Sequence, residues 1–499
     1  MCQPVTVNPI DLTAAALSTA IHDRQVSCRE VMAAHLDRID DRNPRHNAIV
    51  SLRDRESLMA EASQCDDELA AGLSRGWMHG LPVAVKDLAE TKGLRTTSGS
   101  RLLAEHVPDA DCLMVQRMRA AGCIIIGKTN VPEFGLGSHT YNEVFGTTGN
   151  AYDPTRSAGG SSGGACVALA TRMVPIADGS DYMGSLRNPA AWNNVIGLRP
   201  SQGRVPGLPT ADAYMSQMST EGPMARSVLD VALLLATQSG PHPLSPLALD
   251  TRLDEFDGID TTTATLAAGT DGRGGISGLR IGWLGDLGGH LALEPGIVAT
   301  CESGLGRLTG LGCHVEPARL GIDLQRTWQA WLALRHFSIA GSLGVLARDP
   351  AKAALMKPEL RWEIDRGMVL SAVDIARAAQ QRTAFHAAMV GLFEQFDALV
   401  LPSAQVWPFD AALHWPQHIG GRTMDTYHQW MEVTSYATFA GLPAMSLPAG
   451  FSEDDTAPGV PAGLPMGMQL IGRPRGDVDL LVLAHAYETT IDDLGVGNA

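Results

Sequence analysis

Short apolar runs alternate with longer stretches of helical periodicity along this chain of 499 residues. Residues 81–85 (LPVAV) and 123–126 (CIII) are too short and too uniformly apolar for surface helices, so they predict buried strands. Segments 279–284 (LRIGWL) and 396–403 (FDALVLPS) predict two more strands. Helices are expected in the first 75 residues, where apolar residues recur close to every 3.6 positions, and at 163–173, 325–346 and 372–394. Strands that alternate with helices imply a layered α/β fold.

The composition excludes several classes of protein. The net charge is −16, without long runs of one sign, which argues against a nucleic-acid partner or an anionic membrane surface. No C-x-x-C spacing occurs among the eight cysteines, so neither a zinc site nor a redox pair is expected, and no other metal or organic cofactor is predicted. We find neither a signal-peptide pattern nor a stretch approaching the roughly 18 apolar residues of a membrane helix. A reduced, cytoplasmic protein is the expectation.

Two familiar motifs match their patterns but not their contexts. Gly122 to Thr129 (GCIIIGKT) fits the phosphate-binding loop, yet its variable positions are those of a buried strand, whose amides are used in sheet pairing. Gly159 to Gly163 (GGSSG) fits the nucleophile elbow, which needs a strand directly before the serine. The preceding NAYDPTRSA is polar and broken by Pro154, so a loop is predicted there. Neither nucleotide binding nor an elbow is favoured.

Three residues could together activate a nucleophile. Serine needs a partner that takes its proton, and a buried lysine can be that partner because burial lowers its pKa. Lys86 ends an apolar strand, and Asp87 should point to the other face because side chains alternate along a strand. Ser161 lies in a glycine-rich loop that leads into a small-residue helix. Ser185 follows Gly184, which allows backbone N–H groups to turn toward one point, as an oxyanion hole requires.

Long motifs in a fixed order make the chain similar to the amidase signature family of hydrolases. They cover nearly the whole sequence and read GLPVAVKDLAETKGLRTTSGS, IIIGKTNVPEFG, SAGGSSGGA, GSDYMGSLRNPAAW, VIGLRPSQGRVP, AGLPAMSLPAGF and GLPMGMQLIGRP. The family is known for a Ser–Ser–Lys triad. The resemblance implies that Ser185 is the nucleophile, that Ser161 is the bridging serine, following a cis peptide bond, and that Lys86 is the base.

The resemblance also implies an architecture. We expect one domain with an α/β/α sandwich, in which a large mixed sheet is covered by helices on both faces. Within it, residues 1–75 would be an N-terminal helical segment, 76–250 the catalytic core, 253–278 a loop insertion rich in Asp, Thr and Gly, and 279–499 the completion of the sheet and the substrate pocket. Neither a metal nor an organic cofactor is needed, and the oligomeric state stays open, with a homo-oligomer as one alternative.

The loop before the nucleophile departs from the family pattern. Family members carry small residues before this serine, whereas here the stretch is DYMGS. We expect the backbone N–H groups of Tyr182, Met183, Gly184 and Ser185 to hold the oxyanion, with strain if residue 183 needs a positive φ, because methionine lacks the freedom of glycine. The supporting residues expected around the triad are Asp181, Arg187 and Ser162.

Aromatic residues cluster in two stretches that could shape a pocket. Five of the nine tryptophans fall in 326–337 and 405–430. Aromatic-lined pockets suit apolar or aryl groups. The predicted substrate is therefore a small aryl or hydrophobic amide, or else an anilide, carbamate or ester. The predicted pocket residues are Trp328, Trp331, Trp407, Trp415, Tyr427 and Trp430.

Two alternatives remain open. The A-type chain of an amidotransferase, which shares these motifs, releases ammonia from glutamine with a partner chain, and the DYMGS departure counts against it. A scaffold or binding protein of the same fold would have lost catalysis, and retention of all three triad positions counts against that.

Overall fold

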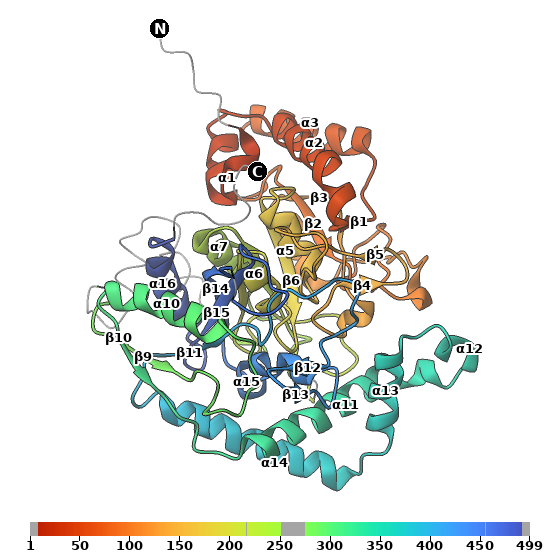
Figure 1. The fold of residues 1–499 in the computed structure, drawn as a ribbon. Helices are drawn as coiled ribbons and strands as arrows, with labels where there is room; N and C mark the ends of the chain where they lie inside the picture. Colours follow the sequence, from red (N-terminus) through yellow and green to blue (C-terminus); the bar gives the residue numbers. More distant parts are fainter. Residues whose placement is uncertain (1–7, 216, 251–274, 455, 492–499) are drawn as a thin grey trace.

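A mixed sheet of eight strands forms the centre of the computed structural model, which describes residues 8–215, 217–250, 275–454 and 456–491 (Figure 1). β10, β9 and β11 run parallel to one another, whereas every later pair in the sheet is antiparallel. The strand order is β10 (His314–Pro317), β9 (Arg280–Trp283), β11 (Ala398–Pro402), β15 (Pro465–Ile471), β14 (Ala444–Phe451), β7 (Ile196–Arg199), β8 (Thr220–Ala225) and β6 (Ile176–Asp181). This confirms the predicted α/β fold.

A second, three-stranded sheet lies beside the edge strand β6. Its order is β1 (Ile49–Val50), β3 (Ile124–Thr129) and β2 (Pro82–Lys86), with β2 parallel to β3. The strands predicted from LPVAV and CIII are therefore confirmed, but they pair with each other outside the large sheet. Two short hairpins complete the strands, β4 (Tyr141–Asn142) with β5 (Gly146–Thr147) and β12 (His418–Ile419) with β13 (Arg422–Thr423).

Helices cover the two sheets. α1 (Ala14–His22), α2 (Cys28–His46) and α3 (Arg55–Ala70) lie at the top of Figure 1, beside the small sheet, and confirm the helical start. The helices that contact strands of the large sheet are α5 (Gly163–Ala170), α6 (Asn188–Trp192), α7 (Val228–Gln238), α10 (Ile297–Gly310) and α16 (Asp477–Glu488). The remaining α-helices of the described residues are α4 (Leu113–Ala120), α11 (Leu324–Ala347), α12 (Pro350–Ala353), α13 (Pro358–Met368), α14 (Ala372–Leu392) and α15 (Ser435–Ala440). The 3₁₀ segments in the part of the chain that the structure describes are η1 (Pro9–Asp11), η2 (Arg101–Leu103), η3 (Glu133–Gly135) and η4 (Gln429–Thr434).

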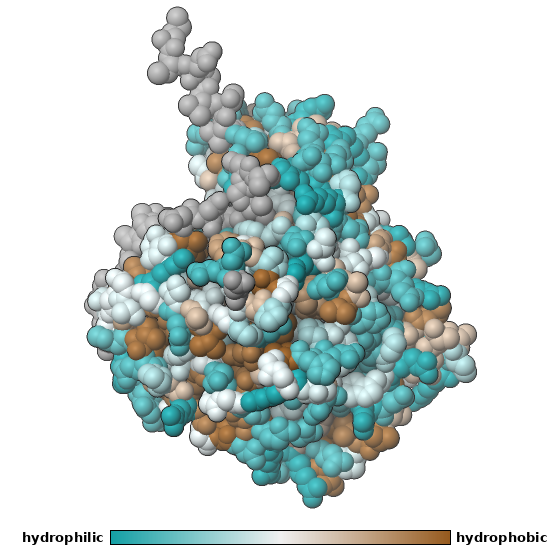
Figure 2. All heavy atoms as spheres, in the orientation of Figure 1, coloured by the Kyte–Doolittle hydropathy of each residue, from teal (hydrophilic) through white to brown (hydrophobic). Residues whose placement is uncertain are grey.

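One helix corrects an expectation about apolar segments. Among the described residues, α11 is long and apolar enough to cross a membrane by length and composition, with a mean hydropathy of 1.3 in its most apolar window. A third of that window is buried, and the helix packs against α13 and α14. The high hydropathy of α11 comes from its leucine, alanine and isoleucine residues and from its small number of charged residues. Such a composition is as typical of a core helix in a globular protein as of a membrane span. The face of the molecule in Figure 2 is largely hydrophilic, with hydrophobic side chains gathered in patches, in keeping with the acidic composition.

Most of the predicted loop insertion, 253–278, lies outside the described residues. Within the motif GCIIIGKT, Ile124–Thr129 form buried β3, as expected for a strand, and the Nζ atom of Lys128 is 2.8 Å from Oγ1 of Thr91. The approach to Ser161 is a loop, and α5 begins only at Gly163. The strand predicted for the first motif and the loop predicted before the second are therefore confirmed.

Candidate active site

Lys86 ends β2 where the small sheet meets the large one. Its backbone N–H donates to the carboxylate of Asp178 on β6, with N–O distances of 3.1 and 3.3 Å, so this contact ties the two sheets together. The lysine is only 1% exposed. Asp87 faces the other side, where its carboxylate accepts hydrogen bonds from Thr97. The strand alternation therefore gives Lys86 no carboxylate from its own strand.

The Lys86 amine is surrounded by hydroxyl groups. Its Nζ atom lies 2.9 Å from Oγ of Ser161, 2.8 Å from Oγ of Ser162 and 3.0 Å from Oγ of Ser180. Among the described residues it forms no ion pair. Burial lowers the pKa of Lys86 to about 7, and the charge of Asp178 only partly opposes that shift. A neutral amine in contact with a serine hydroxyl can accept its proton.

The loop before α5 holds Ser161 close to this amine. The peptide bond between Gly160 and Ser161 is cis, and Gly159 has a φ of +74°. A side chain at Gly159 would also meet Pro189, because its Cβ would lie 2.8 Å from the Cα of that proline. Glycine at this position thus permits both the backbone conformation and the close approach of the two loops. Ser161 and Ser162 are both buried.

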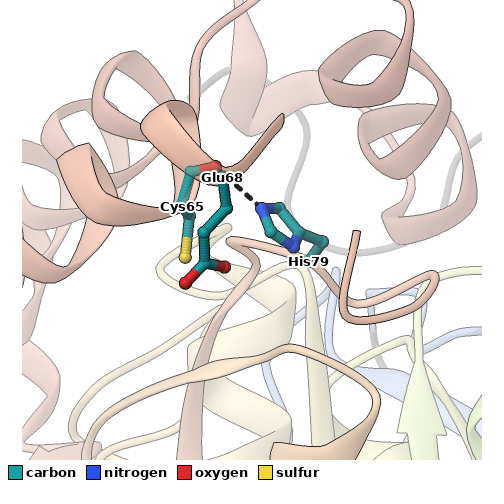
Figure 3. A group of neighbouring side chains, drawn as sticks. All are labelled: Cys65, Glu68 and His79. Atoms are coloured by element: carbon teal, nitrogen blue, oxygen red, sulfur yellow. Dashed lines mark hydrogen bonds between the residues drawn. The ribbon is translucent and has the colours of Figure 1, made fainter. Parts of the chain in front are cut away.

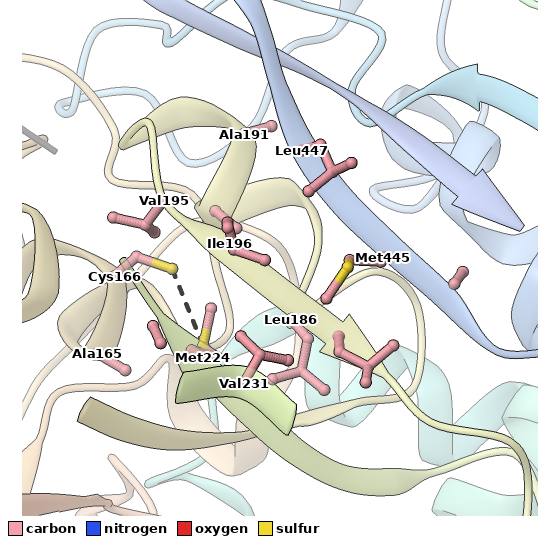
Figure 4. Close-up of a cluster of buried hydrophobic side chains, with 14 of the residues drawn as sticks. Ala165, Cys166, Leu186, Ala191, Val195, Ile196, Met224, Val231, Met445 and Leu447 are labelled. Carbon is pink, nitrogen blue, oxygen red and sulfur yellow. Dashed lines mark hydrogen bonds between the residues drawn. The ribbon is translucent and has the colours of Figure 1, made fainter. Parts of the chain in front are cut away.

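Ser185 lies on the turn between β6 and α6. Its carbonyl accepts a hydrogen bond from the backbone N–H of Ser162 at 3.3 Å, which places the two serine loops side by side. The next residue, Leu186, is anchored in a buried cluster with Met224 and Met445 (Figure 4). Among the described residues, no hydrogen bond joins the hydroxyls of Ser161 and Ser185. The structure therefore makes the first link of the predicted relay, Lys86 to Ser161, but not the second.

The backbone of this turn corrects the oxyanion-hole prediction at one position. The N–H of Gly184 donates to Oδ1 of Asp181 at 2.8 Å, so that carboxylate already occupies it. The N–H groups of Tyr182, Met183 and Ser185 have no acceptor within the described part of the chain. Three of the four predicted donors are thus left for a ligand.

Positive φ falls on the glycine of this turn and not on the methionine. Gly184 has a φ of +86°, whereas Met183 is not among the described residues in that region. The Met183 carbonyl accepts from Oγ1 of Thr434 at 2.9 Å, and its side chain is buried in the core. The strain considered for residue 183 therefore does not arise.

A buried ion pair braces the turn. Two nitrogens of Arg187 contact the carboxylate of Asp181, at 3.0 and 2.9 Å, and both side chains are fully buried. Burial would raise the pKa of Asp181, but the charge and hydrogen bonds of Arg187, the charge of Arg199 and the N–H of Gly184 together outweigh burial and lower that pKa to about 2. Arg187 also donates to the carbonyl of Thr434 at 2.9 Å. The carboxylate is thus fixed where it holds the N–H of Gly184.

Half of the predicted aromatic residues line one cavity near the serine loops. Trp415, Tyr427 and Trp430 share it with Ser138 and His139. This cavity lies beside the Ser161 loop, because a Cβ at residue 160 would approach the backbone N of His139 to 3.0 Å. The cavity has a volume of about 10 Å³, enough for about one water molecule, and Lys86, Ser161 and Ser185 do not line it.

The other three tryptophans do not line this cavity. Trp328 and Trp331 stack on each other with ring centroids 5.1 Å apart and are buried against the turn, where Trp331 contacts Tyr182 edge-on. Trp407 is 1% exposed and donates its indole N–H to the carbonyl of Pro295. These contacts place the three tryptophans in the core, and their role in a substrate pocket stays a prediction.

Sequence reasoning missed Ser180 and Asp178, both on β6. They are two residues apart and so share one face of the strand. Asp178 accepts a hydrogen bond from the backbone N–H of Lys86, and the hydroxyl of Ser180 accepts one from the Lys86 amine. The period of two along IADGSD was the signal that could have found them.

The sequence matches known proteins along nearly its whole length. A family model described as Amidase matches residues 30–481. The chain belongs to the amidase signature family. This amidase is similar to the A component of the glutamyl-tRNA(Gln) amidotransferase of Synechococcus sp. (strain CC9605), with 32% identity over 501 residues that cover 96% of each chain.

Solved structures of the family agree with the fold of this amidase. A bacterial aryl acylamidase of the amidase signature family matches with a TM-score of 0.84 and 29% identity, over 96% of each chain. A 6-aminohexanoate cyclic dimer hydrolase in complex with substrate matches with a TM-score of 0.81 and 25% identity, over 97% of this chain and 98% of the other. The protein is therefore an amidase signature hydrolase, an enzyme that acts on carbon–nitrogen bonds.

One cluster of this amidase resembles a metal site by residue type. Ligand atoms of Cys65, Glu68 and His79 lie within 4.8 Å of one another (Figure 3). Both ring nitrogens of His79 form hydrogen bonds with the backbone, Nε2 with the carbonyl of Cys65 and Nδ1 with the N–H of Arg75. Both carboxylate oxygens of Glu68 contact the guanidinium of Arg75. In this arrangement Nε2 of His79 carries the proton donated to Cys65 and Nδ1 accepts from Arg75, so the imidazole has no lone pair left for a metal and the cluster does not fit a three-ligand site.

Proposed function

We propose that this amidase hydrolyses carboxylic amides through an acyl-enzyme on Ser185. The observation that carries the proposal is the Lys86 amine, which is buried, contacts the hydroxyl of Ser161 at 2.9 Å and has no ion-pair partner in the described residues. An amine with a pKa of about 7 is a suitable general base near neutral pH. This arrangement supports serine acyl transfer without histidine.

Acylation begins with two proton transfers. Lys86 accepts the proton of Ser161, and Ser161 accepts that of Ser185 as the Ser185 oxygen bonds to the substrate carbonyl carbon. This step requires the two hydroxyls to come into hydrogen-bond contact when substrate binds. The N–H groups of Tyr182, Met183 and Ser185 are the donors available for the oxyanion.

The tetrahedral intermediate then loses the amine. The carbon–nitrogen bond breaks while the proton held by Lys86 returns through Ser161 to the leaving nitrogen. Water attacks the resulting ester by the same route, its proton passing to the relay and then to Ser185, and the carboxylic acid leaves.

An aryl or hydrophobic amide is the substrate class that we propose. The cavity beside the Ser161 loop is lined by Trp415, Tyr427 and Trp430, rings that pack well against aryl groups, and it must widen from about 10 Å³ to admit one. The similarity to an aryl acylamidase at 29% identity supports the same class. Anilides, carbamates and esters are accordingly part of the test panel.

Release of ammonia from glutamine is the second candidate function. It is supported by the 32% identity to the A component of glutamyl-tRNA(Gln) amidotransferase over almost the full length of both chains. Lys357 and Glu359 line the cavity together with the aromatic rings, so the lining alone does not select against the charged head group of glutamine. A binding protein of the same fold without catalysis is the remaining alternative.

A chromogenic panel distinguishes these functions. Aryl amides, anilides, carbamates, esters, small aliphatic amides and glutamine are compared with the purified chain, and Ser185→Ala serves as the control. We expect turnover of aryl amides to exceed that of aliphatic amides and glutamine, and to be lost in Ser185→Ala without loss of thermal stability. A preference for glutamine would favour the amidotransferase, and inactivity on the whole panel would favour the binding protein. Labelling of Ser185 by a fluorophosphonate tests the nucleophile directly.

A further inference from the structure

A second and much larger cavity is lined by helices α11 and α14 and by the chain that follows β7. Its volume is about 1210 Å³, and it shares no lining residue with the aromatic cavity beside the Ser161 loop. Its apolar wall includes Leu334 and Phe337 of α11, Ile375 of α14 and Phe439 of α15. A cavity of this size and lining has room for a small organic molecule.

Arg382 on α14 brings a positive charge to this cavity. Its Nε donates to the carbonyl of Phe439 at 2.9 Å, and its Nη2 donates to Oε1 of Gln202 at 3.1 Å and to the carbonyl of Gln217 at 3.3 Å. All three acceptors are uncharged. Among the described residues, no carboxylate forms an ion pair with this guanidinium, and its Nη1 donates no hydrogen bond. A partly buried cation that lacks a counter-charge favours an anionic ligand.

Ser201 adds a hydroxyl without a partner to the same cavity. The residue lines the cavity and is only 1% exposed. Its backbone N–H donates to Oδ1 of Asp477 at 2.7 Å, but its Oγ atom has no hydrogen-bond partner within the described residues. Buried hydroxyls are nearly always hydrogen-bonded, so this one calls for a partner in the cavity. Because the next residue, Gln202, accepts from Arg382, the hydroxyl and the guanidinium belong to the same part of the lining.

The other ionisable groups of the lining do not cancel the charge of Arg382. Arg475 adds a second guanidinium, and His386 donates from Nδ1 to the carbonyl of Ala440 at 2.7 Å. Asp212 is the acidic residue of the lining, and its Oδ1 accepts hydrogen bonds from two backbone N–H groups of its own loop. Positive charge therefore exceeds negative charge around this cavity.

Tyr182 places the cavity beside the nucleophile turn. Its side chain lines the cavity together with Ser338, whereas its backbone N–H is among the donors left for the oxyanion. Lys86, Ser161 and Ser185 do not line the cavity. A ligand bound here would thus contact the turn without occupying the candidate active site.

We propose that this cavity is a second ligand site, which binds a carboxylic acid with an apolar ring or chain. The carboxylate pairs with the guanidinium of Arg382 and accepts a hydrogen bond from the Ser201 hydroxyl, and the apolar part packs against Phe337 and Phe439. A carboxylate suits this site because both polar groups can donate, and hydrogen bonds between a guanidinium and a carboxylate are among the strong ones. Neither the proposed nucleophile nor the proposed base takes part, so the site does not depend on the proposed function.

Calorimetry with two matched probes tests the site. Phenylbutyrate carries a ring and a carboxylate, whereas phenylbutanol carries the ring and an uncharged hydroxyl. We expect the acid to bind at least about tenfold more tightly than the alcohol, because a hydrogen bond to a charged group contributes at least that factor. Equal affinities would overturn the assignment of a carboxylate. Absence of binding of the acid at millimolar concentration would overturn the site itself.

A charge variant identifies the group that holds the acid. Arg382→Gln should weaken the binding of phenylbutyrate about tenfold or more and leave that of phenylbutanol unchanged. Arg377→Gln is the matched control, because Arg377 lies on the same helix but is exposed and does not line the cavity. It should bind both probes as the wild type does. Unchanged affinity for the acid in Arg382→Gln would refute the proposed contact.

Gly341→Trp fills part of the cavity and leaves both polar groups in place. Gly341 lines the cavity, and nothing lies within 4 Å of its Cβ position, so the variant should fold and bind both probes about tenfold or more weakly. Gly306→Trp in α10 is the control, with an equally open Cβ position outside the lining. Should Arg382→Gln not fold, wild-type affinity for the acid in Gly341→Trp would overturn the inference. Wild-type protein that binds the acid but resists labelling of Ser185 by a fluorophosphonate would contradict the proposed function alone.

Discussion

The Nζ atom of Lys86 lies 2.9 Å from Oγ of Ser161, at a strand end where no carboxylate forms an ion pair with the amine in the described part of the chain. Burial lowers the pKa of Lys86 to about 7. Because only the neutral amine can accept a proton, kcat/KM should rise as the pH increases through about 7 and then level off. A pH series of kcat/KM on an aryl amide measures this limb.

Lys86→Met is the control for the pH profile. It removes the titrating amine, and we expect its activity to fall by a factor of about 10³ or more and to lose the limb near pH 7. A wild-type acid limb near pH 4 would instead point to a carboxylate as the base.

Lys86 touches two neighbouring hydroxyls, and we expect them to differ in function. Ser162 is enclosed, since a Cβ at Gly179 would come within 2.8 Å of its Oγ, and it serves to hold the amine. Ser161→Ala should reduce kcat by about 10³-fold because the relay is interrupted, whereas Ser162→Ala should reduce it about tenfold. Single-turnover measurements of acylation compare the two variants. Equal losses would contradict the assignment of Ser161 as the bridge.

Gly184 should tolerate no side chain. Its φ is +86°, and a Cβ there would lie 2.5 Å from the Cβ of Thr434. Gly184→Ala is expected to lower the free energy of unfolding by about 2 kcal/mol or more and to abolish acylation of Ser185. Gly391→Ala in α14 is the control, because nothing lies within 4 Å of its Cβ position. In a helix that replacement should raise stability by about 0.5–1 kcal/mol. Urea unfolding measures both.

The sequence predicted the strand and the turn that carry this site better than the contacts that these two elements make. The run LPVAV predicted a strand that ends in Lys86, but apolarity does not reveal which strand pairs with it, and the strand belongs to the small sheet. Glycine before Ser185 predicted the sharp turn. That Asp181 would reach forward to the N–H of Gly184 could not be predicted, because it depends on the path of the loop.

Contacts between distant segments were the least predictable part. Helix α13 has a polar sequence, PELRWEIDRGM, and was not predicted to contribute to the site. Its Glu363 is fully buried, and its Oε1 accepts from the hydroxyl of Tyr427 at 2.7 Å and from Nε of Arg335 at 2.9 Å. The guanidinium of Arg335 lies over the ring of Tyr182, 4.4 Å from its centre. Glu363 thus connects the aromatic cavity with the nucleophile turn.

Loss of the Glu363 charge should be far more costly than loss of one of its donors. Glu363→Gln leaves the buried guanidinium of Arg335 without a counter-charge and should lower the free energy of unfolding by about 3–5 kcal/mol. Tyr427→Phe removes a single hydroxyl from the same carboxylate and should cost about 1 kcal/mol while raising KM for aryl amides. Urea unfolding and steady-state kinetics measure the two effects. Similar stabilities of both variants would refute the central role of the carboxylate.

Acid should weaken the turn through Asp181. Burial opposes the shift, but the charges of Arg187 and Arg199 and the hydrogen bonds to this carboxylate together lower its pKa from 3.8 to about 2. A depressed pKa contributes stability that is complete above the unfolded-state value and is lost as the pH falls from about 4 to about 2. The shift corresponds to about 2 kcal/mol.

Urea unfolding between pH 6 and pH 2.5 tests this contribution. Asp181→Asn removes the titrating group and leaves Arg187 and Arg199 buried without it, so at pH 6 it should lose about 3–5 kcal/mol. Below pH 4 the wild type should lose stability more steeply than the variant, and the difference between them should narrow by about 2 kcal/mol. The exposed Asp365→Asn should follow the wild type throughout. A constant difference between wild type and Asp181→Asn across this range would mean that Asp181 is not held ionised by Arg187, and the turn would then need another explanation for its rigidity.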